Sequence, residues 1–130
     1  RAVWSVDNRT AGFRLCGENS KAVRVECRIG GSDLNPYLAI AMQLACGLAG
    51  IEEKLTLDAP MSGSAYDTRK GREIPQTLRD AMGTLTRSKM LRGTFGSDVV
   101  DHYAHAAAWE LEEFDRVVTD YEIARGFERA

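Results

Sequence analysis

The stretch AVRVECRIGGSDLNPYLAIAMQLACGLAGI, residues 22–51, joins an alternating segment to a long apolar one. Apolar and charged residues alternate in its first part, and a strand places such alternating residues on opposite faces. The apolar set is Val23, Val25, Cys27 and Ile29, and the charged set is Arg24, Glu26 and Arg28. Asn35 and Pro36 then suit the start of a helix over residues 35–54. This helix is apolar almost all round, so we expect it to be buried on most sides.

The segments on either side predict the rest of the fold. AVWSV and AGFRLC precede the stretch and are typical of strands, and the turn GENSK favours an antiparallel pair. Residues 55–74 form a polar connector, which we expect to be a mobile surface loop. Helices follow over 75–130, ending in one long amphipathic helix from Ser97 to Phe127. The fold class is therefore α+β, with short antiparallel β-strands at 1–30 followed by a helical C-terminal half.

Composition limits the function classes. The 130 residues suit one domain, and a net charge of −2 with mixed signs does not indicate nucleic-acid binding. No apolar run is long enough to span a membrane. Three cysteines without a CxxC motif favour a reduced, cytoplasmic setting, and Cys27 and Cys46 have the positions of core thiols. Because the chain begins at Arg1, we expect a piece of a longer protein.

The charged residues of the strand in residues 22–29, Arg24, Glu26 and Arg28, have two interpretations. They are the solvated face of a strand with ordinary ion pairs, or they are an anion-binding surface with one metal-binding carboxylate, Glu26. Arginine donors form a planar fork that suits phosphate and carboxylate, and carboxylate oxygens suit Mg²⁺ or Mn²⁺. Arg9 and Arg14 add two cations upstream, and a bulge at Gly12 would re-aim one of them. These residues alone leave both interpretations open.

Other candidate residues carry weaker signals. His102 and His105 have a spacing that can chelate zinc, but no third ligand flanks them, which favours surface histidines. Tyr66 lies in the connector and has the features of an ordinary loop tyrosine.

Several ordered motifs resemble one known family. DNRTAGFR followed by RVECRIGGSDLNPYLAIAMQLACGLAGI resembles the C-terminal part of the catalytic domain of glutamine synthetases. The matching motifs are N-R-x-x-x-x-R, R-x-E-x-R, N-P-Y-L and, at the end of the family's A-G-L-x-G-I helix, the residues from Gly47 to Ile51. The tail EEFDRVVTDYEIARGFERA resembles the branch that includes γ-glutamyl-polyamine synthetases.

The resemblance implies an ATP-dependent ligase. ATP phosphorylates the γ-carboxylate of glutamate, and ammonia or another amine displaces the phosphate. By this resemblance Glu26 is a ligand of Mg²⁺ or Mn²⁺, and Arg28 binds glutamate and the transferring phosphate. Arg9 stabilises the transfer, and the nucleotide-binding set is Arg9, Arg14 and Arg24. The resemblance also implies a homo-oligomer.

The chain departs from the family in ways that limit these expectations. The N-terminal domain, the other metal-binding carboxylates and the flap glutamate are missing from these 130 residues. We therefore expect the isolated chain to be inactive, and a non-catalytic truncated paralogue that serves in binding or oligomerisation is the alternative. Tyr66 matches in position a tyrosine that some family members adenylylate, but its surroundings diverge. Neither the amine nor the preferred metal follows from the sequence.

Overall fold

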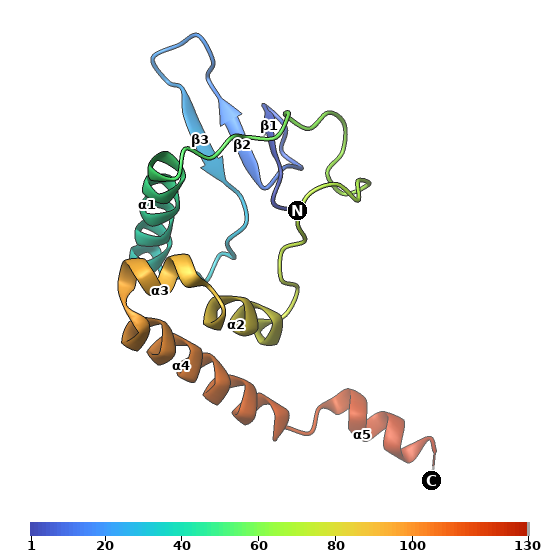
Figure 1. The fold of residues 1–130 in the computed structure, drawn as a ribbon. Helices are drawn as coiled ribbons and strands as arrows, with labels where there is room; N and C mark the ends of the chain where they lie inside the picture. The colour runs from blue at the N-terminus through green and yellow to red at the C-terminus, as the bar shows by residue number, and fades with distance from the viewer. Residues whose placement is uncertain (130) are drawn as a thin grey trace. The chain divides into compact units, whose positions relative to one another are not determined.

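The computed structural model describes residues 1–129 and divides the chain into two compact units, Arg1–Ile74 and Pro75–Ala130. The first unit contains strands β1 (Trp4–Val6), β2 (Phe13–Cys16) and β3 (Arg24–Cys27) and helix α1 (Pro36–Glu52). The second contains helices α2 (Leu78–Thr86), α3 (Lys89–Phe95), α4 (Ser97–Asp115) and α5 (Asp120–Phe127) (Figure 1). The predicted α+β class is confirmed.

The sheet has the strand order β1-β2-β3. β2 and β3 pair antiparallel, as the alternating segments and the turn between them predicted, and Arg14 lies opposite Glu26. β1 instead pairs parallel with β2, so the expectation of antiparallel strands is wrong for this pair. β1 has only three residues, and the short connection 7–12 is therefore long enough to return the chain to its start. Asp7 begins that return with a positive φ of 47°.

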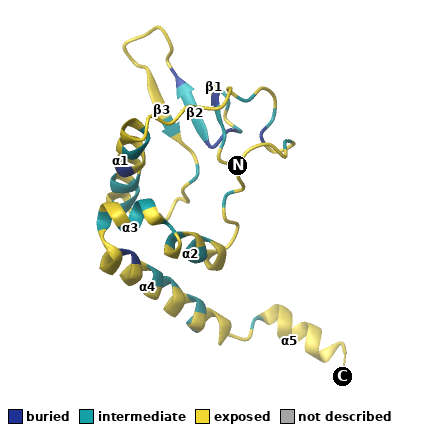
Figure 2. Ribbon diagram, in the orientation of Figure 1, coloured by how far each residue is buried: buried dark blue, intermediate teal, exposed yellow. Residues whose placement is uncertain are grey.

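The two faces of the sheet differ in chemistry. Ser5, Arg14 and Glu26 are in register on one face, and Ser5 is buried at 5% exposure. The opposite face carries Val25 and Cys27, which are both exposed. Most of β3 has the colour of exposed residues in Figure 2. The prediction of a core position for Cys27 is therefore wrong, because within the first unit no element covers this part of β3.

Helix α1 begins where the sequence predicted. Asn35 caps it, since its side-chain oxygen accepts hydrogen bonds from the backbone N–H groups of Tyr37 and Leu38, and Pro36 occupies the first turn. The predicted burial is wrong, however, because Ala45 is the only buried residue of α1. Large apolar side chains are 59–84% exposed at Tyr37, Ile40, Leu44, Leu48 and Ile51. Cys46 is exposed as well, so it is not a core thiol.

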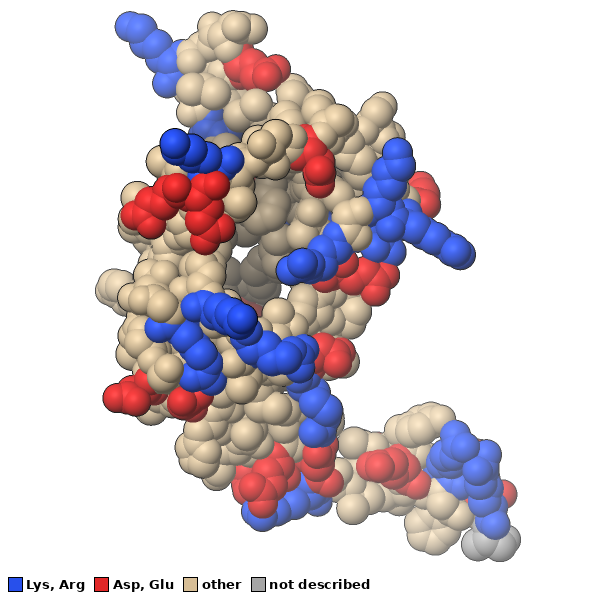
Figure 3. Space-filling view, in the orientation of Figure 1, with Lys and Arg blue, Asp and Glu red and all other residues tan. Residues whose placement is uncertain are grey.

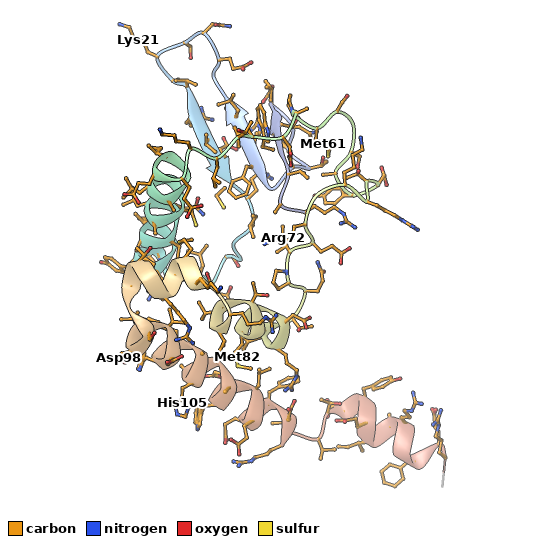
Figure 4. The ribbon with its side chains drawn as sticks, viewed as in Figure 1. Lys21, Met61, Arg72, Met82, Asp98 and His105 are labelled. Atoms are coloured by element: carbon orange, nitrogen blue, oxygen red, sulfur yellow. The ribbon has the colours of Figure 1, made fainter. Side chains whose placement is uncertain are left out.

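The connector between α1 and α2 is held against the N-terminal segment. The backbone N–H of Met61 donates to the carbonyl of Trp4 at 2.9 Å, and Arg72 pairs with Ala2 as an isolated bridge. Figure 4 labels Met61 and Arg72 on this segment. The connector is on the surface, but these bonds are not those expected of a freely mobile loop.

In the second unit, α2 and α3 both pack against α4, and Val100 of α4 is buried at 2% exposure. The predicted single helix from Ser97 to Phe127 is wrong, because α4 ends at Asp115 and α5 starts at Asp120. Thr119 and Glu122 form a capping box, in which each side chain bonds the backbone N–H of the other residue. These two hydrogen bonds satisfy backbone N–H groups at the start of α5. They explain why a new helix begins there and the chain does not continue α4.

Candidate functional site

The carboxylate of Glu26 lies among three guanidinium groups. Its Oε2 is 3.1 Å from Nη1 of Arg14, and its Oε1 is 2.9 Å from Nη2 of Arg24. A longer contact of 3.8 Å joins Oε2 to Nη1 of Arg28. Arg14 faces Glu26 from the neighbouring strand, whereas Arg24 and Arg28 lie two residues away along the chain on the same side. The structure therefore brings together four of the five residues that the sequence singled out.

Arg14 is the most enclosed of these arginines, with 15% of its side chain exposed. One terminal nitrogen donates to Glu26 and the other to Asp7. Its Nε is buried and has no hydrogen-bond partner within the described residues. With both terminal nitrogens engaged, Arg14 is a fixed support for Glu26.

These contacts set the protonation of the cluster. Hydrogen bonds from Arg14, then from the thiol of Cys16 and from Arg24, lower the pKa of Glu26 below its usual range. Bonds to Asp7 and Glu26 raise the pKa of Arg14. Burial, followed by the neighbouring Glu26, raises the pKa of the Cys16 thiol. At neutral pH the cluster thus contains an ionised carboxylate, charged arginines and a protonated thiol.

Arg9 lies beside this cluster but outside the strands. It sits in the turn before β2, and its side chain is exposed, with no ion pair inside the described part of the chain. Its carbonyl accepts a hydrogen bond from Nε of Arg28 at 3.1 Å, and the backbone N–H of Arg28 donates to Gly12 at 2.8 Å. Because Arg9 lies in this turn, its side chain does not follow the alternation of side chains between the two faces of β2. The predicted bulge at Gly12 is not needed to explain its direction.

The residues of this chain do not by themselves fit a resident metal ion. A divalent ion of this class takes about six oxygen ligands, and Glu26 supplies one carboxylate that three cations already surround. Within residues 1–129 no group of three or more His, Cys, Asp and Glu residues is placed to hold a metal. The assignment of Glu26 as a metal ligand therefore depends on carboxylates outside this chain.

Sequence reasoning missed two members of the cluster. Asp7 was not among the predicted site residues, and its contact with Arg14 depends on the parallel pairing of β1 with β2. Cys16 is opposite Arg24, two residues from Arg14 on the same face, and is buried at 5% exposure. The alternation of β2 could have identified Cys16, because residues two apart share a face.

A hollow lies between α2 and α4 in the other unit. Its apolar floor includes Met82 and Leu111, and its rim carries charged residues. These charges pair with one another, for example Arg79 with Asp115 at 2.7 Å. Figure 3 shows acidic and basic side chains intermixed on the face it displays, without a large continuous patch of one sign. Mutually paired, exposed charges of this kind do not make a site for a charged ligand.

Comparison with known proteins decides the family. Residues 1–126 match the model of the glutamine synthetase catalytic domain. The chain belongs to the glutamine synthetase family. The resemblance seen in the motifs around Arg9 and Glu26 is thereby confirmed.

Three relatives illustrate the range of this family. The chain is 44% identical over 127 residues to γ-glutamylethanolamide synthetase GlnA4 of Streptomyces coelicolor, covering 98% of this chain and 27% of the relative. It is 40% identical to glutamate–isopropylamine ligase of a Pseudomonas species, with 94% and 27% covered. It is 33% identical to glutamine synthetase of Thermus thermophilus, with 95% and 29% covered. The chain therefore spans little more than a quarter of the length of these relatives.

None of its described helices has the length and apolar character needed to cross a membrane.

Proposed function

We propose that this chain forms one wall of the active site of an ATP-dependent glutamate–amine ligase. The observation that carries the proposal is the convergence of Arg14, Arg24 and Arg28 on Glu26, with the Arg9 turn bonded to Arg28. The relatives named above are synthetases or ligases. One name specifies a γ-glutamylethanolamide, and another specifies glutamate and isopropylamine. The cationic surface suits the phosphate and carboxylate groups of such substrates.

The proposed reaction has two steps. An oxygen of the γ-carboxylate of glutamate attacks the γ-phosphorus of ATP, and the bond to the bridging oxygen breaks, releasing ADP. The nitrogen of the amine then attacks the γ-carbonyl carbon of γ-glutamyl phosphate. Phosphate leaves with the electron pair of the C–O bond, and the amine nitrogen loses a proton. Both steps spread negative charge over oxygen atoms, so fixed cations stabilise their transition states.

In this proposal the arginines have different roles. Arg28 binds glutamate and the transferring phosphoryl group, and Arg9, whose side chain is exposed, stabilises the transfer. Arg24, with 57% of its side chain exposed, contacts the nucleotide phosphates. Arg14 orders the surface, since Asp7 and Glu26 already occupy its terminal nitrogens. Glu26 serves as a metal ligand only together with carboxylates that this chain does not contain.

The test compares the protein expressed from its full gene with the 130-residue chain. Each is incubated with ATP, glutamate, Mg²⁺ or Mn²⁺ and one amine: ammonia, ethanolamine, isopropylamine or a polyamine. We expect ADP and the γ-glutamyl amide from the full protein with at least one amine, and no turnover by the isolated chain. Arg28→Lys in the full protein should lower kcat by roughly 100-fold or more, as the loss of a transition-state donor does. Arg69→Lys, an exposed change in the connector, is the matched control.

The second candidate function is a non-catalytic binding or oligomerisation module. The exposed apolar side chains of α1 favour it, because such surface commonly marks an interface. A full protein that forms oligomers in light scattering but makes no γ-glutamyl amide with any of these amines would support the module and refute the ligase. Oligomers accompanied by turnover would support the ligase in a homo-oligomeric form.

A further inference from the structure

The turn that carries Arg9 is tied to the connector by the residues on both sides of Arg9. Nδ2 of Asn8 donates to the carbonyl of Gly63 at 2.8 Å. Oδ1 of Asn8 accepts from the backbone N–H of Thr10 at 3.0 Å and from its hydroxyl at 2.7 Å. The Thr10 hydroxyl in turn accepts from the backbone N–H of Ala65 at 2.8 Å. Asn8 and Thr10 thus form a chain of hydrogen bonds that ends on the connector at two points.

This junction is partly shielded from water, because the bonds of Thr10 to Asn8 and Ala65 are half-buried, whereas the bond from Asn8 to Gly63 is exposed. Ala11 next to the turn and Ala65 on the connector are only 2% and 3% exposed, which places them among the most buried described residues. Shielding from water strengthens the hydrogen bonds of such a junction and raises the cost of leaving one of them unmade. The geometry of the Arg9 turn is therefore strongly coupled to the position of residues 63–65.

The connector is itself fixed on both sides of this junction. Before it, the hydroxyl of Ser5 donates to the carbonyl of Met61 at 2.6 Å, and the indole of Trp4 donates to the carbonyl of Asp58 at 2.7 Å. After it, Arg72, labelled in Figure 4, pairs with Ala2 as an isolated bridge. Arg1 forms an ion pair with Glu73 at 2.7 Å. Because the connector is bonded to the N-terminal segment on both sides of the junction, residues 63–65 are fixed and the turn that is bonded to them is held in place.

We propose that Asn8 and Thr10 are positioning residues that use the connector to hold Arg9 in place for phosphoryl transfer. The inference rests on the proposed function, because it assigns Arg9 to the reaction. The same turn also orients Arg28, whose Nε donates to the carbonyl of Arg9. A displacement of about 1 Å in a group that acts on the transition state can lower the rate about 100-fold.

The test uses Thr10→Val in the protein expressed from its full gene. Valine keeps the shape of threonine and removes the oxygen that links Asn8 to Ala65. We expect kcat to fall 10- to 100-fold, while KM for ATP and for glutamate changes less than threefold. Tm should also fall, because the buried N–H of Ala65 loses its acceptor, but the variant should stay folded at the assay temperature. Thr10→Ser keeps the hydroxyl and should retain most of kcat. Asn8→Asp keeps the size of the side chain but replaces the donor to Gly63 with a carboxylate oxygen and adds a negative charge, so it should lower kcat as well.

Amide hydrogen exchange supplies a readout that does not depend on activity. In Thr10→Val the amide of Ala65 should exchange faster than in the wild type or in Thr10→Ser, because its acceptor is gone. Faster exchange at Ala65 with an unchanged kcat would overturn the inference. A fall in kcat seen only at temperatures where Thr10→Val is unfolding, and not restored in Thr10→Ser, would show a merely structural role and also overturn it. An inactive wild type would refute the proposed function and this inference with it, whereas an active wild type with fully active variants would refute this inference alone.

Discussion

The substitution Gly12→Ala tests the packing that supports the candidate site. Gly12 is buried, and a Cβ added there would lie 2.5 Å from the carbonyl oxygen of Arg1 and 3.3 Å from Cγ1 of Ile29. The first contact is with backbone, so no change of rotamer relieves it. Either the N-terminal segment or the turn before β2 must move. That movement would disturb the bond from the backbone N–H of Arg28 to Gly12.

The size of the effect follows from the cost of overpacking. Adding a methyl group to a well-packed site costs about 1–3 kcal/mol. With a urea m-value of about 1 kcal/mol/M for a unit of this size, the midpoint should fall by about 1–3 M. Gly47→Ala is the matched control, because a Cβ at Gly47 meets nothing within 4 Å in the middle of α1. There alanine should stabilise the helix by about 0.5–1 kcal/mol through its higher helix propensity.

The assay is urea unfolding of the 130-residue chain followed by tryptophan fluorescence. Trp109→Phe in the background leaves Trp4 as the single tryptophan, so the signal reports on the first unit. A Gly12→Ala midpoint equal to or above that of the background protein would refute the reasoning. If Gly47→Ala lowered the midpoint as far as Gly12→Ala, the effect would not be specific to the close approach at Arg1.

Three further predictions address other features. Thr77→Ala removes the N-cap of α2 and should cost about 1 kcal/mol in thermal unfolding of the second unit, whereas the mid-helix change Thr84→Ala should cost less. Iodoacetamide at pH 8 should alkylate Cys27 and Cys46 quickly and Cys16 slowly, because burial shields Cys16 and raises its pKa; equal rates by mass spectrometry would contradict this. Because the folded pKa of Glu26 is lowered, its stabilisation is present above the unfolded pKa and is lost as pH falls through the folded value. Urea midpoints between pH 7 and 3 should therefore fall less steeply in Glu26→Gln than in the wild type, and parallel curves would contradict the assignment.

Local patterns in the sequence were sufficient for part of the fold. The alternation over residues 23–29 and the turn GENSK fix the register of β2 and β3, because a slip by one residue would exchange the two faces. Asn35 and Pro36 mark the start of α1 for equally local reasons. The break between α4 and α5 was also readable, since Thr119 and Glu122 have the spacing of a capping box, but the hydrophobic periodicity outweighed it in our prediction.

Features that depend on distant parts of the chain could not be predicted in this way. Hydrophobicity predicted that α1 would be buried, yet burial depends on which elements surround a helix, and the first unit covers little of its surface. The parallel pairing of β1 places Asp7 beside Arg14, and no pattern within either segment indicates that contact. The bonds from Asn8 and Thr10 to residues 63–65 join segments more than 50 residues apart. The sequence therefore identified Arg14, Arg24, Glu26 and Arg28 of the cluster, but neither Asp7 and Cys16 nor the contacts that hold the cluster together.

The strand and the helix in the stretch from Ala22 to Ile51 differ in how far the first unit surrounds them. The contacts of the strand lie within this unit, because arginines from β2 and β3 hold Glu26 and the neighbouring Cys16 is buried. The helix is not surrounded in this way, since the large side chains of α1 lie exposed. The arginine cluster therefore owes its shape to the sheet, the Arg9 turn and the connector, and not to a buried helix behind it. A substitution at an exposed position of α1, such as Leu44→Lys, should accordingly leave the reactivity of Cys16 unchanged, whereas Glu26→Gln should alter it.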